Sequence, residues 1–99
     1  MDDVKTKEFT ELLDELGIEK SSNSEYALIL FNDDVNDMAW IIDALFNVCN
    51  LNEQESVTIM LEANTTGKAV AKTGSLKEMT DMKKGLNAKY INAEVEENN

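Results

Sequence analysis

A short polar segment between two apolar stretches holds the side chains best suited to chemistry. Three carboxylates and two amides fall within six consecutive residues, namely Asn32, Asp33, Asp34, Asn36 and Asp37. Carboxylate and amide oxygens are suitable acceptors for an ammonium group, which carries three donors and one positive charge. A solvated turn that leads into a helix is the simpler interpretation of the same residues. The segment alone leaves both interpretations open.

Other kinds of chemistry fit these residues poorly. Asn32, Asp34 and Asn36 match the first three ligand positions of an EF-hand calcium loop, but Asp37 stands where that loop requires glycine. Acid–base hydrolysis would need one carboxylate to be buried with a raised pKa, and nothing nearby in the sequence predicts that burial. A phosphate loop at Gly67-Lys68 lacks its earlier glycine and its following Ser or Thr. We therefore expect no enzyme, no metal and no cofactor.

The charge of the chain narrows the choice of partners. Its 99 residues include 9 Lys and Arg against 20 Asp and Glu, for a formal net charge of −11. Nucleic acids and anionic membranes attract basic proteins, so we expect neither as a partner. No apolar run reaches the roughly 18 residues that a membrane span needs, and the acidic start Met1–Asp3 is unlike a signal peptide. The absence of His excludes His-based acid–base chemistry and His metal ligation. The single Cys49, which we expect to be buried and reduced, indicates a cytoplasmic protein, and we expect it to be a monomer.

The acidic segment lies between a predicted strand and a predicted helix. Tyr26–Phe31 is short, apolar and bounded by polar residues, which is typical of a strand buried on both faces. After the segment, Asp37 is well placed to cap an amphipathic helix. Apolar residues at helical spacing define the inner face of that helix: Met38, Ile41, Ile42, Leu45, Val48 and Cys49.

A second helix is predicted directly downstream. Asn52 and Glu55 have the spacing of a capping box at its start, and Gly67 is the residue expected in the left-handed position after its end. The helical spacing places three apolar residues on its inner face: Val57, Met60 and Leu61.

The rest of the core predicts a strand, a helix and a strand. Lys68–Lys72 is a short strand candidate, and Ser75 with Glu78 forms a capping box for a third helix. Apolar residues then alternate with polar ones at Ile91, Ala93 and Val95. The order β-α-α-β-α-β predicts an α/β (α+β) two-layer sandwich, with helices on one face of a three-stranded sheet.

Residues 1–24 resemble an extension of this core. Lys20–Ser24 is a polar linker, and before it apolar residues recur at helical spacing, namely Phe9, Leu12, Leu13 and Leu16. A helix packed on the core is an equally good interpretation. We therefore divide the chain into an extension (1–24), a core domain (25–96) and a tail (97–99).

Two motifs, taken together, resemble a known family. The run Tyr26–Met38 contains Asn-Asp-Asp directly after a strand, and Ile59–Ala69 reads Ile-Met-Leu-Glu-Ala-Asn-Thr-Thr-Gly-Lys-Ala. At this separation they resemble ClpS proteins, adaptors that deliver substrates bearing destabilising N-terminal residues to Clp-type ATP-dependent proteases. The resemblance covers about residues 25–96. It implies the same β-α-α-β-α-β fold and a protein that binds substrates without catalysing a reaction.

The resemblance also implies a site for the first residue of a substrate. In the family, an Asn, an Asp and a helix His hold the substrate's α-ammonium group. Here Asn32 and Asp33 match the first two, Asp34 is the second Asp of the motif, and Asn64 replaces the His. Met38 matches a gatekeeper that screens against β-branched first residues. The implied apolar pocket and its rim consist of Ile41, Met60, Ala63, Ile91 and Asn36.

A second surface is implied for the N-terminal domain of the AAA+ unfoldase, of ClpA or ClpC type. Glu78 and Lys83 match charged positions of that surface, although helix capping and solvation would also account for them. The replacement of the family His by Asn64 leaves an alternative open. In this alternative, the protein is a divergent regulator that docks on the unfoldase without standard N-degron recognition.

Overall fold

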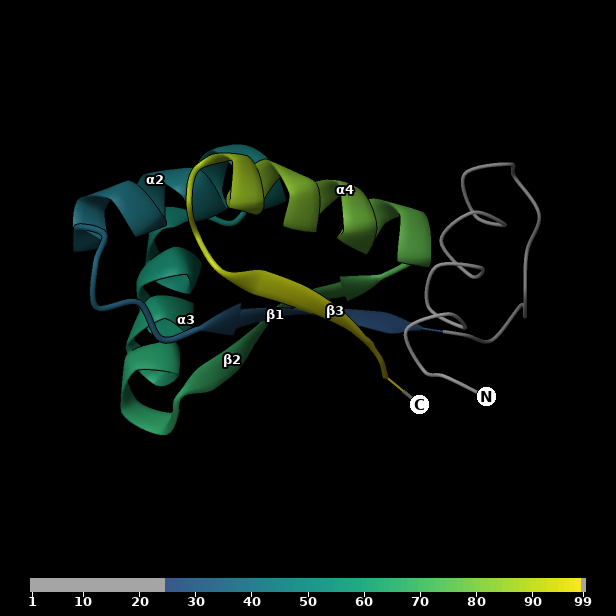
Figure 1. Ribbon diagram of the computed structural model, residues 1–99, viewed down its shortest axis with the longest axis horizontal. Helices are drawn as coiled ribbons and strands as arrows, with labels where there is room; N and C mark the ends of the chain where they lie inside the picture. Colours follow the sequence, from purple (N-terminus) through teal and green to yellow (C-terminus); the bar gives the residue numbers. More distant parts are fainter. Residues whose placement is uncertain (1–24, 99) are drawn as a thin grey trace.

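The computed structural model describes residues 25–98. Three strands and three helices follow one another as β1 (Tyr26–Phe31), α2 (Met38–Cys49), α3 (Glu53–Thr66), β2 (Lys68–Gly74), α4 (Leu76–Ala88) and β3 (Ala93–Glu97) (Figure 1). This order confirms the predicted β-α-α-β-α-β architecture. The extension predicted at residues 1–24 lies outside the described residues.

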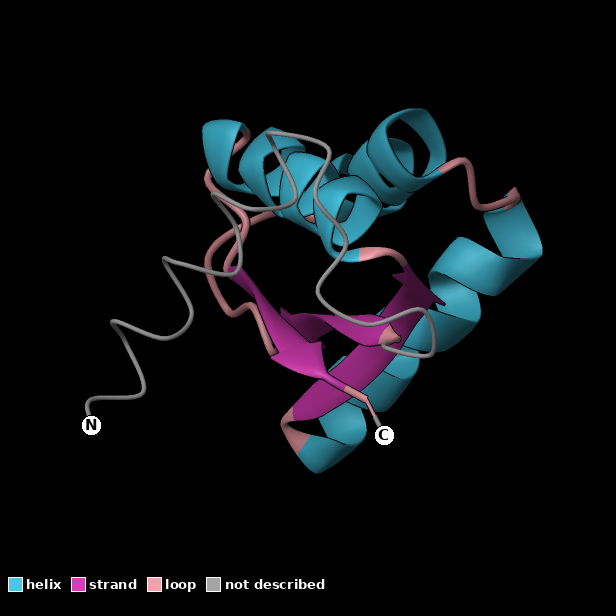
Figure 2. Cartoon of the chain, turned by 90° about the vertical axis from the view of Figure 1, so that its right-hand side faces the viewer, coloured by secondary structure: helices cyan, strands magenta, loops and turns pink. Residues whose placement is uncertain are grey.

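The sheet has β1 at its centre, in the strand order β2-β1-β3, and both pairings are antiparallel. Helices α2 and α4 lie over one face of the sheet, while α3 packs beside β2 (Figures 1 and 2). Residues 26–30 of β1 are all buried, which confirms the predicted central strand. The pairing of β1 with β2 shifts register between Leu28 and Ile29, and the shift leaves Ala71 as the extra residue of a bulge.

The core lies between this sheet and the helices. Leu28 of β1, Leu45 of α2 and Leu86 of α4 are fully buried and belong to one hydrophobic cluster. Cys49 is buried as predicted. Its burial raises the pKa of the thiol to about 11, although the nearby charge of Lys72 lowers it in part. The Lys72 ammonium also donates to the backbone oxygen of Cys49 at 2.8 Å, which satisfies a carbonyl at the end of α2.

The capping residues predicted at the starts of α3 and α4, and the glycine predicted after α3, are confirmed. At the start of α3, the Asn52 side chain accepts from the Glu55 backbone N–H and the Glu55 side chain accepts from the Asn52 backbone N–H. Ser75 and Glu78 form the same reciprocal pair at the start of α4. Gly67 follows α3 with a φ of 98°, a left-handed conformation that glycine adopts without a steric cost.

Several details differ from the sequence predictions. Met38, predicted to lie on the inner face of α2, is 57% exposed. Strand β2 continues to Gly74 rather than ending at Lys72. Leu61 is 48% exposed, because the buried face of α3 follows Ser56, Met60 and Ala63 at steps of four and three residues. Asp37 occupies the N-cap position of α2, but its side chain makes no capping hydrogen bond. The last strand begins at Ala93 rather than Ile91.

Candidate functional site

The loop between β1 and α2 is organised around the carboxylate of Asp33. Its Oδ1 accepts hydrogen bonds from the backbone N–H groups of Val35 at 2.9 Å and Asn36 at 2.8 Å. Its Oδ2 accepts from Asn36 Nδ2 at 2.7 Å. Side chains of Asp and Asn commonly close turns in this way, by accepting from backbone N–H groups two or three residues ahead. Asp33 therefore determines the local shape of the acidic loop.

The same hydrogen bonds keep Asp33 charged. Partial burial alone would raise the pKa of the carboxyl group, but the three bonds from Asn36 and Val35 outweigh it, and the pKa lies below its usual value of 3.8. Asp33 is therefore ionised at neutral pH. An ionised carboxylate has about four acceptor positions, so three accepted bonds leave Asp33 able to take one more donor.

Asn36 ties this loop to the connection between α4 and β3. Besides its bond to Asp33, Asn36 Nδ2 donates to the backbone oxygen of Tyr90 at 2.9 Å. Both hydrogens of the amide nitrogen are thus engaged within the protein. Asn36 is expected from the resemblance to lie at the rim of a pocket, and the structure gives it a positioning role between two loops.

The end of α3 lies against the same loop. The backbone N–H of Asn32 donates to the backbone oxygen of Gly67 at 3.0 Å, directly after the helix that bears Asn64. Both Asn32 and Asn64 are exposed, as is Asp34, whose Oδ1 lies 3.4 Å from Asn32 Nδ2. The structure therefore places the residues expected to hold an ammonium group on two adjoining segments.

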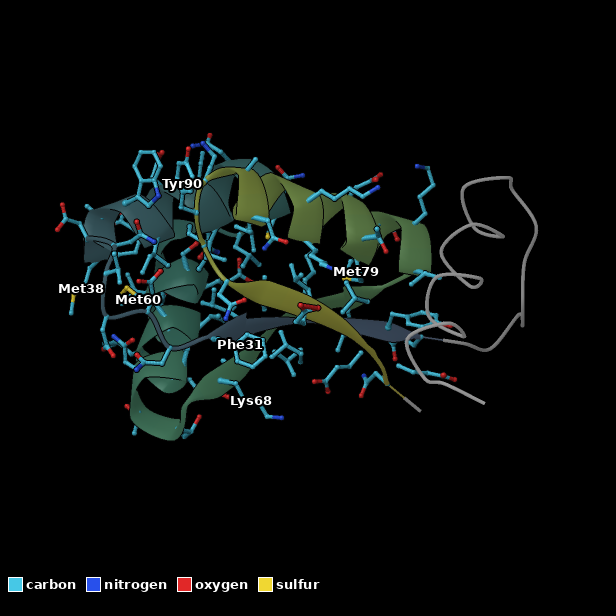
Figure 3. All side chains as sticks on the ribbon, viewed as in Figure 1. Phe31, Met38, Met60, Lys68, Met79 and Tyr90 are labelled. Atoms are coloured by element: carbon cyan, nitrogen blue, oxygen red, sulfur yellow. The ribbon has the colours of Figure 1, made fainter. Side chains whose placement is uncertain are left out.

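The predicted apolar pocket residues come from three parts of the fold and are all buried. Ile41 of α2, Met60 and Ala63 of α3, and Ile91 before β3 are at most 3% exposed and belong to the same hydrophobic cluster. Met38, the first residue of α2, is 57% exposed. Figure 3 shows Met38 and Met60 at the same end of the longest axis. The predicted gatekeeper is thus a surface residue, whereas the predicted pocket residues belong to the interior.

The two residues expected to bind an unfoldase lie on α4 and have structural contacts there. Glu78 Oε1 accepts from the backbone N–H of Ser75 at 3.2 Å, as part of the capping box. Lys83 Nζ lies 3.5 Å from Glu94 Oε2, an ion pair that joins α4 to β3. The structure does not bring these residues together with the acidic loop.

Two aromatic residues near the loop have no counterpart among the sequence predictions. Trp40 Nε1 donates to the backbone oxygen of Lys89 at 2.9 Å, and Tyr90 has a φ of 65° and is 87% exposed. Neither belongs to a motif or to an apolar stripe. Only the position of Tyr90 next to Ile91 could have drawn attention to it.

Taken together, these features define a small α/β domain with an acidic loop directly after its central strand. Its loop presents a charged carboxylate and the exposed amide of Asn32, and the elements around the loop contribute a buried apolar cluster. Within residues 25–98, no group of three or more His, Cys, Asp or Glu side chains is arranged to hold a metal ion. In the same part of the chain, no helix is long and apolar enough to cross a membrane.

Comparison with known proteins identifies the family. The sequence model described as "ATP-dependent Clp protease adaptor protein ClpS" matches residues 21–94. The ATP-dependent Clp protease adapter protein ClpS of Prochlorococcus marinus (strain MIT 9515) is 33% identical over 78 residues, which cover 78% of this chain and 74% of the relative. The chain therefore belongs to the ClpS family, and the resemblance noted in the sequence is confirmed.

A solved structure agrees with the fold. Agrobacterium tumefaciens ClpS2 bound to L-phenylalaninamide matches with a TM-score of 0.70 at 20% identity, covering 76% of this chain and 98% of that one. At this level of identity the match supports the arrangement of strands and helices, which is the arrangement predicted from the sequence.

Proposed function

We propose that this protein is an adaptor that binds substrates beginning with a bulky hydrophobic residue and delivers them to a Clp AAA+ unfoldase for degradation. The observation that carries the proposal is the ionised Asp33 carboxylate with an unused acceptor position. It lies in a loop that adjoins the end of α3. A free α-ammonium group supplies the charge and the donors that such an acceptor requires.

The buried apolar cluster supplies the second half of the proposed recognition. Once the ammonium group is bound at Asp33, Asn32 and Asn64, the first side chain would pack against Ile41, Met60, Ala63 and Ile91, with Met38 at the entrance. L-Phenylalaninamide, bound in the matching A. tumefaciens ClpS2 structure, carries both a free α-amine and a bulky aromatic side chain. That ligand supports the proposed substrate class.

Delivery requires a second contact, for which we propose the surface of α4 that contains Glu78 and Lys83. The partner would be the N-terminal domain of a ClpA- or ClpC-type unfoldase. The protein itself would catalyse no step: it holds the substrate, and the unfoldase and protease act on it.

Binding of short peptides tests the recognition step. Fluorescence anisotropy should show tight binding of peptides that begin with Phe, Leu, Tyr or Trp, and weak binding of an Ala peptide or of acetylated Phe. Asp33→Asn retains an oxygen for the two backbone N–H groups but removes the charge, and it should weaken binding by about 10- to 100-fold. Glu96→Gln, which removes an exposed carboxylate of β3, is the matched control and should change binding by less than about twofold.

Three outcomes would contradict this assignment. If acetylated Phe binds as well as free Phe, the loop does not recognise an ammonium group. If Asp33→Asn and Glu96→Gln weaken binding equally, general acidity rather than Asp33 attracts the peptide. If no peptide binds while the unfoldase does, the protein is the divergent regulator that the replacement of the family His by Asn64 suggests.

A further inference from the structure

The connection between α4 and β3, residues 89–92, turns sharply to bury one side chain. Helix α4 ends at Ala88 and β3 begins at Ala93. Between them, Ile91 is 1% exposed and belongs to the hydrophobic cluster of the core. Tyr90, directly before it, has a φ of 65°, in the left-handed region that residues with a side chain adopt only at a cost in free energy. The position of Ile91 therefore depends on a strained backbone.

Three side chains hold this strained backbone in place through hydrogen bonds. Each donates to one of three consecutive backbone oxygens at 2.9 Å: Trp40 Nε1 to Lys89, Asn36 Nδ2 to Tyr90, and Asn87 Nδ2 to Ile91. Asn87 belongs to α4 itself, whereas Asn36 and Trp40 lie 54 and 49 residues from their acceptors in the sequence. A strained conformation persists when the surrounding structure fixes it in this way. The two distant donors therefore determine where the connection lies relative to the rest of the fold.

Trp40 joins the connection to α2 through two contacts with one residue. It lies in the first turn of α2 and is 44% exposed. Besides accepting the hydrogen bond from Nε1, Lys89 places its Nζ 5.5 Å from the centre of the indole ring, within the distance of a cation–π contact. The next residue of the helix, Ile41, is 3% exposed and belongs to the same cluster as Ile91. The contact of Trp40 with Lys89 therefore joins the two segments of backbone that carry Ile41 and Ile91.

We propose that Trp40 is a positioning residue that holds Ile91 in the apolar pocket and thereby sets how closely the pocket fits the first side chain of a substrate. This inference rests on the proposed function. Trp40 acts through the connection, because its N–H donates to the Lys89 oxygen rather than to the substrate. Without the Nε1 donor, the strained turn loses one of its two distant hydrogen bonds, and Ile91 gains freedom to move away from the bound side chain. The hydrogen bonds that shape the loop at Asp33 come from within that loop, so the ammonium site keeps its form.

Peptides that differ only in their first residue test the effect on the pocket. Trp40→Phe keeps an aromatic ring in the first turn of α2 but removes the Nε1 donor. In fluorescence anisotropy with the full-length protein, the preference for a Phe or Leu peptide over an Ala peptide should fall by about three- to tenfold in this variant, the range for one hydrogen bond. The Ala peptide, which depends mainly on the ammonium group, should bind the parent and the variant within about twofold. Phe46→Leu, which alters an exposed aromatic residue of the same helix, is the matched control and should keep the full preference.

Hydrogen exchange tests the positioning itself and needs no peptide. The backbone N–H of Ile91 donates to the Leu86 oxygen at 3.0 Å, and that of Gly67, at the end of α3, donates to the Ala63 oxygen at 2.9 Å. Measured by NMR, exchange at Ile91 should be about three- to tenfold faster in Trp40→Phe than in the parent, while exchange at Gly67 should be unchanged. A loss of overall stability would instead accelerate exchange at both N–H groups.

The outcomes separate this inference from the proposed function. If Trp40→Phe leaves the first-residue preference unchanged, or weakens the Phe, Leu and Ala peptides equally, the inference is wrong and the proposed function stands. The inference is also wrong if exchange at Ile91 does not accelerate, or if Phe46→Leu reduces the preference as much as Trp40→Phe does. If the parent binds acetylated and free Phe peptides alike, the proposed function fails, and the role of Trp40 in the pocket fails with it.

Discussion

The Asp33 carboxylate shapes the acidic loop and, in the proposed function, also supplies the negative charge that binds the substrate. Its Oδ1 accepts hydrogen bonds from two backbone N–H groups of the loop, and its Oδ2 accepts one from the Asn36 side chain. The same Asn36 amide donates to the backbone oxygen of Tyr90. Substitutions of Asp33 therefore act on stability and on binding together. Separating the two effects requires measurements of both in the same variant.

The lowered pKa of Asp33 predicts a pH-dependent contribution to stability. Because the folded-state pKa lies below the usual value of 3.8, the charged carboxylate stabilises the folded state at pH values above 3.8. This contribution is lost as the pH falls through the folded-state pKa. In urea unfolding, the parent should be more stable than Asp33→Asn at neutral pH, and the difference should shrink in acid. A difference that stays constant from neutral pH into acid would contradict the prediction.

Because Asn64 replaces the family His, we expect the protein to bind substrate peptides less tightly than it would with a His at this position. A neutral amide provides one acceptor without charge, so Asn64→His should tighten binding of Phe- or Leu-initiated peptides, by up to about 10- to 100-fold if the imidazole makes a strong bond to the ammonium group. The gain should vanish below about pH 6, where a protonated imidazole repels the ammonium group. Peptide titrations at several pH values test this expectation, with Asn64→Gln as a control that does not titrate. If Asn64→His binds no more tightly at any pH, Asn64 does not face the ammonium group.

At the scale of elements, the contact between α2 and α4 depends on a glycine. A Cβ built on Gly85 would lie 2.8 Å from Cγ1 of Val48, closer than real Cβ contacts allow. Alanine at a helix interior gains about 1 kcal/mol over glycine, whereas overpacking costs about 1–3 kcal/mol. We therefore expect Gly85→Ala to lower the free energy of unfolding, measured by urea denaturation.

A double-mutant cycle tests whether the close contact with Val48 causes this destabilisation. Val48→Ala alone should destabilise the protein by removing partly buried methyl groups that pack against the core. Combined with Gly85→Ala, it should destabilise less than the sum of the two single changes, because the added methyl group then has room. If the two changes in the free energy of unfolding simply add, or if Gly85→Ala is more stable than the parent, α2 and α4 can shift to accommodate the added methyl group.

The elements were largely predictable because their signals are local. The alternation near Val95, the capping boxes at Asn52 and Ser75, and Gly67 all act within a few residues, and each lies where it was expected. The contacts of Asn36 and Trp40 with the connection before β3 span about 50 residues of sequence. No periodicity encodes such contacts, so the positioning role of Asn36 and the exposed ring of Tyr90 required the three-dimensional fold. The wrong prediction for Leu61 has a local cause, since an apolar residue beside a buried stripe satisfies helical spacing almost as well.

At the scale of the whole molecule, the two proposed surfaces are well separated. Helix α2 begins at one end of the longest axis, next to the acidic loop, and α4 begins at the opposite end (Figure 1). Glu78 lies in the first turn of α4. This separation suits an adaptor, because a substrate held at the loop leaves the start of α4 accessible to a second protein.

The net charge of −11 predicts how substrates reach the site. A long-range negative field attracts positively charged N-termini before contact and therefore raises the association rate more than it slows dissociation. Raising NaCl from about 0.05 to 0.5 M shortens the screening length from roughly 14 to 4 Å, so stopped-flow measurements with a Leu-initiated peptide should show a slower association rate and a nearly constant dissociation rate.

A triple variant that neutralises distant carboxylates together, Glu53→Gln/Asp81→Asn/Glu96→Gln, should also slow association at low salt. Asp33→Asn should instead mainly accelerate dissociation. If the triple variant instead accelerates dissociation as much as Asp33→Asn does, the charge acts through contacts with the bound peptide rather than through steering.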